Sequence, residues 1–402
     1  MHPELVDGLA MEAKTKIIFY ILDGVGGLPM EEGGPTELEA ASTPNLDSLA
    51  KKSICGMLDP VSPGITPGSG PGHFALFGYD PIETIIGRGV LEAAGIDFPL
   101  EDGDVAARGN FATLDKNGLV IDRRAGRPSD EKNRELVEKI RRVLTPQEGV
   151  KFFLETVKEH RVVLVLRGEG LSEALPDTDP QAVDVPPLDP RPLKEEAAKT
   201  SRLVKGVIEK AREVLAQEPQ ANFLLFRGFA QHRRFKSFQE RFKIKALAIA
   251  AYPMYRGLAR QVGMDIYPPV ETLDEEISAL EEKYADYDFF FLHYKKTDST
   301  GEDGNFAAKQ EAISTADAAL PRILALEPDV LVITGDHSTP SLLKLHSWHP
   351  VPVLLYSKVC RPDGVEAYNE RACLAGGLGR MATVNLMPLA LANAGRLAKY
   401  GA

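Results

Sequence analysis

Cysteine is scarce in this chain of 402 residues, which contains only Cys55, Cys360 and Cys373 and has no Cys-x-x-Cys motif. Three cysteines at such wide spacings predict neither a disulfide framework nor a cysteine-based metal site, and they favour a reducing compartment. Positive charge is also in deficit, because 47 basic residues face 58 acidic ones and the formal net charge is -11. This balance argues against nucleic acid or an anionic membrane as a bulk partner, although it leaves room for a local basic pocket.

Long apolar runs are missing as well. No stretch approaches the roughly 18 apolar residues of a membrane-spanning helix, and the opening residues MHPELVDGLAMEAKTK contain no apolar segment of signal-peptide length. We therefore expect a soluble, cytoplasmic protein without a membrane partner. The hydrophobic content of 44% is sufficient for a large core, and the length of the chain predicts about two domains.

Short apolar runs alternate with amphipathic helical stretches along much of the sequence. This alternation predicts an α/β fold in which a mostly parallel sheet carries helices on both faces. The expected strands lie within residues 16–24, 245–252, 287–294, 329–337 and 350–357. The expected helices lie within residues 271–285, where Thr272 and Glu275 have the spacing of a capping box, and within 305–327 and 385–395.

The middle of the chain has a different pattern. Residues 107–128 have the pattern of a β-meander with an Asp-Lys-Asn-Gly turn. They are followed by a helix (129–144), two strands (151–168), a proline-rich loop (175–192) and a further helix (193–217). We interpret residues 82–241 as a smaller α+β domain that is inserted into a core made of residues 1–81 and 242–402.

Three aspartates follow apolar runs: Asp23 after IIFYIL, Asp298 shortly after FFFLHY, and Asp336 after VLVITG. In open α/β sheets, ligands collect at the carboxyl ends of the strands. Each aspartate taken alone is more typical of a helix cap or a turn, but carboxylates that cluster attract cations. His337 and His346 add nitrogen ligands, so the pattern predicts a site for Zn²⁺ or Mn²⁺.

A single hydroxyl, that of Ser69, stands among glycines and prolines in the stretch PGSGPGHFALFGYDP (67–81). The stretch is compatible with a surface turn. A bare loop that lets a serine nucleophile approach a metal ion and a phosphate is the alternative, which the stretch alone favours less than a turn. Two divalent ions at the aspartate cluster favour the second interpretation, because such pairs stabilise the attacking and leaving oxygens of phosphoryl transfer.

Five motifs, ILDGVGG, PGSGPGHFALFGYDP, KKTDSTGEDGNF, TGDHSTP and HSWHPVP, occur in the order found in the archaeal-type cofactor-independent phosphoglycerate mutases of the alkaline phosphatase superfamily. ARGNFATLD and DRRAGR resemble the inserted domain of that family, so the similarity spans residues 16–397. The resemblance implies a glycolytic isomerase that interconverts 2-phosphoglycerate and 3-phosphoglycerate through a phosphoserine. It also implies an alkaline phosphatase-like core, an inserted substrate-binding lid, two divalent metal ions and no 2,3-bisphosphoglycerate. Mn²⁺ is the favoured ion, with Zn²⁺, Co²⁺ or Mg²⁺ as alternatives.

The resemblance also implies a role for individual residues, with Ser69 as the residue that is phosphorylated. One ion would be held by Asp23, Ser69, Asp336 and His337, and the other by Asp298, Glu302 and His346. The family usually has histidine at position 302, and the glutamate of this chain would shift the preference toward Mn²⁺ or Mg²⁺. His349, where the family usually has asparagine or aspartate, is the alternative source of a nitrogen ligand.

Phosphoglycerate carries a phosphate and a carboxylate, and arginine binds both groups bidentately. The candidate substrate-binding residues are Arg108, Arg123, Arg124, Arg127, Arg227, Arg256 and Lys295, and a solvated surface charge is the plain alternative for each arginine. His73 either supports the Ser69 loop or takes part in proton transfer, and we expect His293 to be a core histidine. We expect His160 to be incidental and Asn110 to be a turn residue.

Two other functions stay open at this point. A metal-dependent phosphatase or another phosphomutase on the same core would differ from a mutase in how much phosphate it releases. A non-catalytic, metal-stabilised binding protein would leave Ser69 unlabelled by substrate phosphate. The sequence leaves the oligomeric state open.

Overall fold

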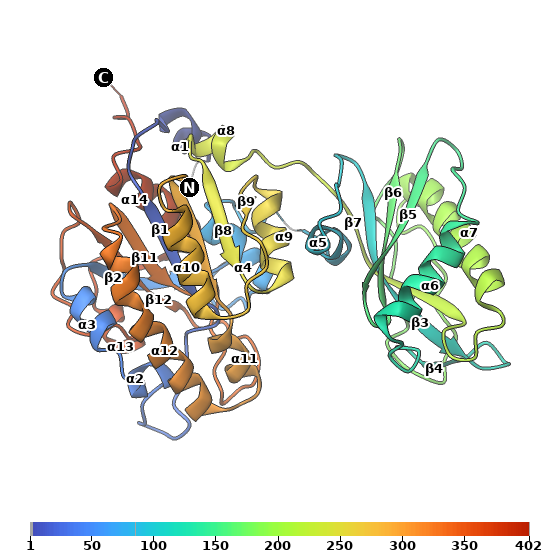
Figure 1. Cartoon of the computed structure of the whole chain (residues 1–402), viewed down its shortest axis with the longest axis horizontal. Coiled ribbons are helices and arrows are strands. Elements are labelled where there is room, and N and C mark those ends of the chain that lie inside the picture. Colours follow the sequence, from blue (N-terminus) through green and yellow to red (C-terminus); the bar gives the residue numbers. More distant parts are fainter. Residues whose placement is uncertain (1–2, 85, 402) are drawn as a thin grey trace. The chain divides into compact units, whose positions relative to one another are not determined.

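The computed structural model describes residues 3–84 and 86–401, and the chain divides into two compact units (Figure 1). The first unit consists of Met1–Ile85 and Lys236–Ala402, and the second consists of Ile86–Phe235. The second unit is therefore inserted into the chain of the first. The boundaries expected from the sequence, after residues 81 and 241, differ from these by four residues (85 − 81) and six residues (241 − 235).

The first unit is built on an eight-stranded sheet in the order β13-β2-β12-β11-β1-β10-β8-β9. Only β12 runs antiparallel to its neighbours within this sheet of described residues, so the expected mostly parallel sheet is confirmed. The strands are β1 (Ile17–Leu22), β2 (Ile54–Asp59), β8 (Ala246–Ala250), β9 (Asp265–Ile266), β10 (Phe289–Tyr294), β11 (Val330–Thr334), β12 (Val351–Ser357) and β13 (Gly379–Ala382). β2, β9 and β13 were not expected from the sequence.

Both faces of this sheet are covered, which explains why its central strands are continuous apolar runs. Every residue of β1 and β11 is buried. Helices α10 and α12 lie on one face (Figure 1), where their apolar side chains pack against alternate residues of β1. α10 begins with the expected capping box of Thr272 and Glu275. The helices are α1 (Pro3–Leu9), α2 (Glu37–Ala40), α3 (Pro44–Ala50), α4 (Ser69–Leu76), α8 (Phe238–Phe242), α9 (Pro253–Gln261), α10 (Leu273–Lys283), α11 (Lys296–Glu302), α12 (Phe306–Ala325), α13 (Glu370–Leu374) and α14 (Leu386–Asn393).

The stretch around Ser69 is a helix start and not the bare loop that the sequence led us to expect. α4 begins at Ser69, and Gly68 is its cap residue in an extended conformation. Pro71 is tolerated because the first N–H groups of a helix have no acceptor inside the helix. Glycine and proline therefore marked the entry to a helix here. No described helix has the length and apolarity needed to cross a lipid bilayer.

The second unit contains a five-stranded sheet in the order β4-β3-β6-β5, with β7 pairing on the other side of β3. All of its pairings are antiparallel. Asn110 lies within β3, opposite Arg161, so the expectation that it is a turn residue is wrong. The elements are α5 (Arg88–Gly95), β3 (Val105–Leu114), β4 (Val120–Asp122), α6 (Asp130–Arg141), β5 (Lys151–Lys158), β6 (Arg161–Arg167), α7 (Ala198–Leu215) and β7 (Phe223–Gln231).

Candidate functional site

The three predicted aspartates meet at the carboxyl edge of the first unit's sheet. β1 lies between β10 and β11, so the residues that follow these three strands are neighbours. Ligand atoms of Asp23, Asp336 and His337 lie within 4.8 Å of one another, and so do those of Asp298, His337 and His346. These five residues, hereafter the metal-ligand group, form two overlapping sets that share His337.

Three atoms of the first set are buried without a hydrogen-bond partner among the described residues. They are Asp23 Oδ1, Asp336 Oδ2 and His337 Nε2. The histidine nitrogen lies 3.3 Å from each of the two carboxylate oxygens. Buried polar atoms without partners are unfavourable, and two oxygens and one nitrogen that face a common point are a donor set for a divalent cation. The residues present therefore fit a metal ion.

Hydrogen bonds orient both histidines of the group for metal binding. His346 Nδ1 lies 3.0 Å from the carbonyl oxygen of Pro67, so Nδ1 carries the proton and Nε2 is free to bind a cation. The Thr339 hydroxyl donates to Asp298 Oδ1 at 2.5 Å, so it can only accept from His337 Nδ1, which lies 3.0 Å away. Such outer contacts fix the tautomer and the ring orientation of metal-binding histidines.

The electrostatics of the group show the effect of crowding acids in a buried place. Burial and the neighbouring Asp336 raise the pKa of Asp23. Burial alone would also raise the pKa of Asp336, but His337 and His73 outweigh this effect and hold the pKa of this carboxyl well below its usual value. Burial lowers the pKa of His337 to about 4, so this side chain is neutral and available as a ligand at neutral pH.

Lys295 is the cation that the chain itself supplies to this site. Its Nζ lies 3.0 Å from Asp23 Oδ2 and also pairs with Asp298 Oδ2. Burial alone would lower the pKa of Lys295, but the two carboxylates outweigh this effect and raise it. One lysine against three carboxylates leaves the group net negative.

Ser69 reaches the metal-ligand group through two neighbours. Its side chain interacts with Tyr255, whose hydroxyl donates to Asp23 Oδ2 at 2.7 Å. Its carbonyl oxygen lies 2.7 Å from His73 Nδ1, and the same nitrogen lies 3.1 Å from Asp336 Oδ2. The contact with the Ser69 carbonyl matches the supporting role considered for His73. Tyr255 was not recognised from the sequence, because nothing in its local pattern marks it.

The two candidates for completing the second set differ in position. Glu302 Oε1 lies 3.9 Å from His346 Nε2, and the Glu302 side chain is 52% exposed. His349 Nδ1 instead lies 3.0 Å from Ser347 Oγ, and its ring stacks on Trp348. Among the described residues, neither belongs to the sets whose ligand atoms converge. His293, expected in the core, is fully buried, with Nε2 3.5 Å from Asp23 Oδ2.

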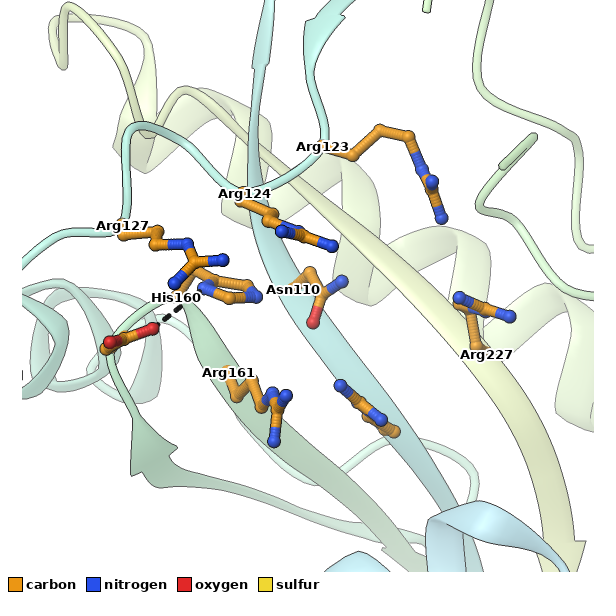
Figure 2. Close-up of a pocket in the computed structure, with 9 residues that line it drawn as sticks. Asn110, Arg123, Arg124, Arg127, His160, Arg161 and Arg227 are labelled. Carbon is orange, nitrogen blue, oxygen red and sulfur yellow. Dashed lines mark ion pairs between the residues drawn. The ribbon is translucent and has the colours of Figure 1, made fainter. Parts of the chain in front are cut away.

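A second site lies within the second unit. A cavity of about 170 Å³ gathers five of the predicted arginines (Figure 2). We call it the arginine pocket, and its lining consists of Arg108, Asn110, Arg123, Arg124, Arg127, Glu159, His160, Arg161 and Arg227. Six guanidinium groups and one carboxylate thus line the cavity. Carboxylates outside the lining pair with some of these arginines, but the excess of guanidinium groups still makes the cavity cationic and suited to an anion.

The arginines of the pocket are held to different degrees. Arg123 binds the buried Asp179 bidentately, at 2.8 and 2.7 Å. Arg227 donates to Gln181 Oε1 at 2.9 Å. Arg124, Arg127 and Arg161 are exposed, and Figure 2 shows them around Asn110. Burial lowers the pKa of Arg108, and the nearby Arg161 and Arg227 lower it further although Glu92 opposes them.

Arg161 and His160 are lining residues that the sequence interpretation missed. Both lie at the turn from β5 into β6, far along the chain from the Arg123–Arg127 stretch, so only the folded sheet brings them together. Burial and Arg161 lower the pKa of His160 to about 4, which leaves a neutral ring in the cavity. His160 therefore lines the cavity, and the expectation that it is incidental is wrong. Arg256 and Lys295, by contrast, belong to the first unit and not to this cavity.

Comparisons with known proteins give the family of the chain. The family model for 2,3-bisphosphoglycerate-independent phosphoglycerate mutase matches residues 50–221. A protein of Thermus thermophilus described as a probable enzyme of this kind is 53% identical over 397 residues, which is 98% of each chain. The chain belongs to this family.

Further relatives and solved structures agree with that membership. A probable phosphoglycerate mutase of the same kind from Thermotoga maritima is 50% identical over 399 residues, or 99% of each chain. The structure of a cofactor-independent phosphoglycerate mutase from Thermoplasma acidophilum is 28% identical, with a TM-score of 0.77 over 94% of this chain and 100% of that one. A protein structure from Pyrococcus horikoshii has a TM-score of 0.81 at 33% identity, over 97% of this chain and 100% of that one. The mutase family is one of isomerases, and the resemblance seen in the five sequence motifs is confirmed.

Proposed function

We propose that this mutase family member interconverts 2-phosphoglycerate and 3-phosphoglycerate through a phosphoserine at Ser69. The reaction would need no 2,3-bisphosphoglycerate and would be a step of glycolysis in the cytoplasm. The observation that carries the proposal is the position of Ser69 at the first residue of α4, where its carbonyl oxygen lies 2.7 Å from His73 Nδ1, which itself lies 3.1 Å from Asp336 Oδ2. A helix N-terminus stabilises negative charge. These contacts support an arrangement in which the proposed nucleophile, the candidate cation ligands and a helix start suited to phosphoryl oxygens lie close together.

We further propose two divalent ions, with Mn²⁺ favoured. One would be held by Asp23, Asp336, His337 and Ser69, and the other by Asp298, His346 and Glu302. The orphaned oxygens and nitrogen of the first set support this assignment. When bound, the ions neutralise the carboxylates and polarise the phosphoryl group.

The residues of the chain then perform the transfer. Ser69 Oγ loses its proton and forms a bond to phosphorus in line with the bond to the glycerate oxygen. That second bond breaks, and the released glycerate oxygen takes up a proton and becomes a hydroxyl. The N–H groups of Ser69 and Gly70 at the start of α4 and the ammonium of Lys295 stabilise the charge on the oxygens of the transferring group. Glycerate remains bound, and its other hydroxyl oxygen loses its proton as it bonds to the phosphorus of the phosphoserine. The bond between phosphorus and Ser69 Oγ then breaks, and Ser69 Oγ takes up a proton.

The arginine pocket is proposed to bind the anionic groups of the substrate through Arg108, Arg123, Arg124, Arg127 and Arg227, together with Arg161. Its charge and its open arginines support this role. Arg256 remains a further candidate in the first unit, where its Nε is buried without a partner among the described residues.

The direct test is a mutase assay coupled to enolase, with no bisphosphoglycerate added, on protein stripped by a chelator and then supplied with single metals. We expect activity to disappear with the chelator and to return with Mn²⁺, while little inorganic phosphate is released. A requirement for bisphosphoglycerate, or unchanged activity in the chelator, would contradict the proposal. Phosphate release that matches substrate consumption would identify a phosphatase instead.

A further inference from the structure

Behind the metal-ligand group lies a lysine that is completely buried. Lys309, on α12, has 0% exposure. Its Nζ donates three hydrogen bonds to backbone carbonyls, to Gly24 at 2.8 Å, Gly26 at 3.0 Å and Thr339 at 2.8 Å. An ammonium group has three donors, so all of them are used.

These carbonyls belong to two loops that carry metal ligands. One loop, residues 23–28, begins with Asp23, and the other, residues 336–341, begins with Asp336 and His337. The loops also contact each other directly, because the N–H of Thr339 lies 3.1 Å from the carbonyl oxygens of both Gly24 and Gly26. Lys309 therefore ties together the two segments whose separation sets the spacing of the first ligand set.

Two carboxylates bind the N–H groups of the same loops. Glu37, which is 0% exposed, accepts from Leu28 N at 3.1 Å and from Ser341 N at 2.7 Å, one residue from each loop. Glu370 accepts from Gly27 N at 2.8 Å and from the Thr36 hydroxyl at 2.7 Å. Both carboxylates attract the Lys309 ammonium, which compensates for part of the effect of its burial.

The close packing explains the glycines of the ILDGVGG motif. A Cβ atom at Gly27 would lie 1.9 Å from Glu37 Oε2, and one at Gly26 would lie 1.9 Å from Ser338 Oγ. A side chain at Gly27 would displace Glu37, and a side chain at Gly26 would displace Ser338 in the second loop. These glycines and Lys309 have no role in the proposed phosphoryl transfer, so we expect a structural role for their arrangement.

We propose that Lys309, Glu37 and Glu370 are positioning residues that form a buried charged frame and hold the two ligand-bearing loops at the spacing that metal binding requires. The carboxylates of Asp23 and Asp336 repel each other before a cation arrives, and the frame resists the separation that this repulsion favours. The inference rests on the metal site of the proposed function. It adds residues that touch neither metal nor substrate.

The test compares Lys309→Met, which keeps the length of the side chain and removes its three donors, with the wild-type protein. The matched control is Asp317→Asn, because Asp317 lies on the same helix, is 2% exposed and binds the Leu46 N–H at 2.7 Å, away from the two loops. Two quantities are measured: the Kd for Mn²⁺ by calorimetry, and the amide hydrogen exchange of residues 23–28 and 336–341 in metal-free protein.

We expect Lys309→Met to raise the Kd for Mn²⁺ by about tenfold or more and to speed exchange in both loops. At saturating Mn²⁺ its kcat should approach that of the wild type, because a positioning residue limits metal occupancy and not the chemical step. Asp317→Asn should lower the free energy of unfolding and leave the Kd unchanged. An unchanged Kd in Lys309→Met, or an equal rise in Asp317→Asn, would overturn the inference.

The experiment also has a defined result if Lys309→Met fails to fold or if the wild-type protein binds no Mn²⁺. If Lys309→Met does not fold, Glu370→Gln takes its place: a raised Kd for Mn²⁺ supports the frame, and an unchanged Kd overturns it. If the wild-type protein binds no Mn²⁺, the proposed metal site and the frame fail together. If the wild type binds Mn²⁺ and the frame variants bind it equally well, the frame alone fails.

Discussion

The metal-ligand group of the first unit and the arginine pocket of the second unit both collect side chains of one charge, but in opposite surroundings. Asp23, Asp298 and Asp336 are each 0% exposed. Arg124 and Arg127 are exposed, and Arg123 already has a carboxylate partner. Like charges in a buried place require a permanent compensating charge, whereas a cationic cavity in contact with water tolerates an anion that comes and goes.

This difference distinguishes a site for an ion that stays bound from a site for a substrate that binds and leaves. In the metal-ligand group, buried atoms point at one another and lack partners, which is the arrangement of a site completed by a bound ion. In the arginine pocket, guanidinium groups are partly satisfied by the chain and partly free for a substrate. Substitutions in the two regions should therefore affect different quantities.

The largest effect is expected at the reacting serine. Ser69→Ala removes the nucleophile while leaving the carboxylates and imidazoles in place, so mutase turnover should fall by at least about 10⁴-fold with the fold and metal content nearly intact. The enolase-coupled assay and metal analysis measure both. Ser62→Ala, in the preceding loop, is the control and should remain active. Appreciable turnover in Ser69→Ala would refute the assignment.

The free energy of unfolding should depend on pH through Glu276, a buried carboxyl of the first unit that is not among the candidate metal ligands. Glu276 is 2% exposed, its Oε2 has no hydrogen-bond partner among the described residues, and burial raises its pKa to about 8. In the unfolded chain the same carboxyl ionises at its ordinary, lower pKa. The folded protein therefore holds a proton that the unfolded protein has lost, and stability declines as pH rises between the two pKa values.

Glu276→Gln should abolish that decline. Relative to the variant, the wild type should lose up to about 1.4 kcal/mol of unfolding free energy per pH unit between pH 5 and pH 8. Urea unfolding across this range, with chelator present, measures the difference. Parallel pH profiles of the two proteins would show that the Glu276 carboxyl is not held protonated by burial.

In the arginine pocket, neighbouring arginines should differ in what they affect. Arg124→Ala removes an open guanidinium and should raise KM for phosphoglycerate by roughly 10- to 100-fold, with little change in unfolding free energy. Arg123→Ala leaves the buried Asp179 without its bidentate partner and should also reduce stability, on the order of 2 kcal/mol. Steady-state kinetics and urea unfolding separate the two. Equal losses of stability would show that both arginines serve the fold alike.

The smallest effect is expected at Glu302. Its side chain is 52% exposed and lies 3.9 Å from His346, so solvent weakens its contribution. Glu302→Ala should lower the occupancy of one ion selectively, with only a several-fold rise in its Kd, as seen by metal titration. Glu311→Ala, at an exposed position of α12, is the control. Two ions bound with unchanged affinity would reject Glu302 as a ligand.

Local sequence patterns were sufficient for much of the first unit's site. Asp23 and Asp336 end buried apolar strands, so their place at the sheet edge followed from the strands themselves. The stretch around Ser69 was misjudged, because glycine and proline mark loops and helix starts alike. Tyr255 was missed because its contact with Asp23 joins residues 232 positions apart.

The second unit's pocket could be predicted only in part for a similar reason. Arg123, Arg124 and Arg127 stand close together in the sequence, and their clustering was visible there. Arg161 joins them because β6 pairs with β3 at a particular register, which no local pattern reveals. The buried Lys309 likewise looks like any helix lysine until the fold places three carbonyls around it.

The central claim is that a phosphoryl group passes through Ser69. The most direct measurement is rapid acid quenching of the enzyme with 3-phosphoglycerate labelled in its phosphate, followed by mapping of the labelled peptide. We predict label on the peptide that contains Ser69 in the wild type and none in Ser69→Ala. An active enzyme that carries no label, or carries it on another residue, would contradict the account.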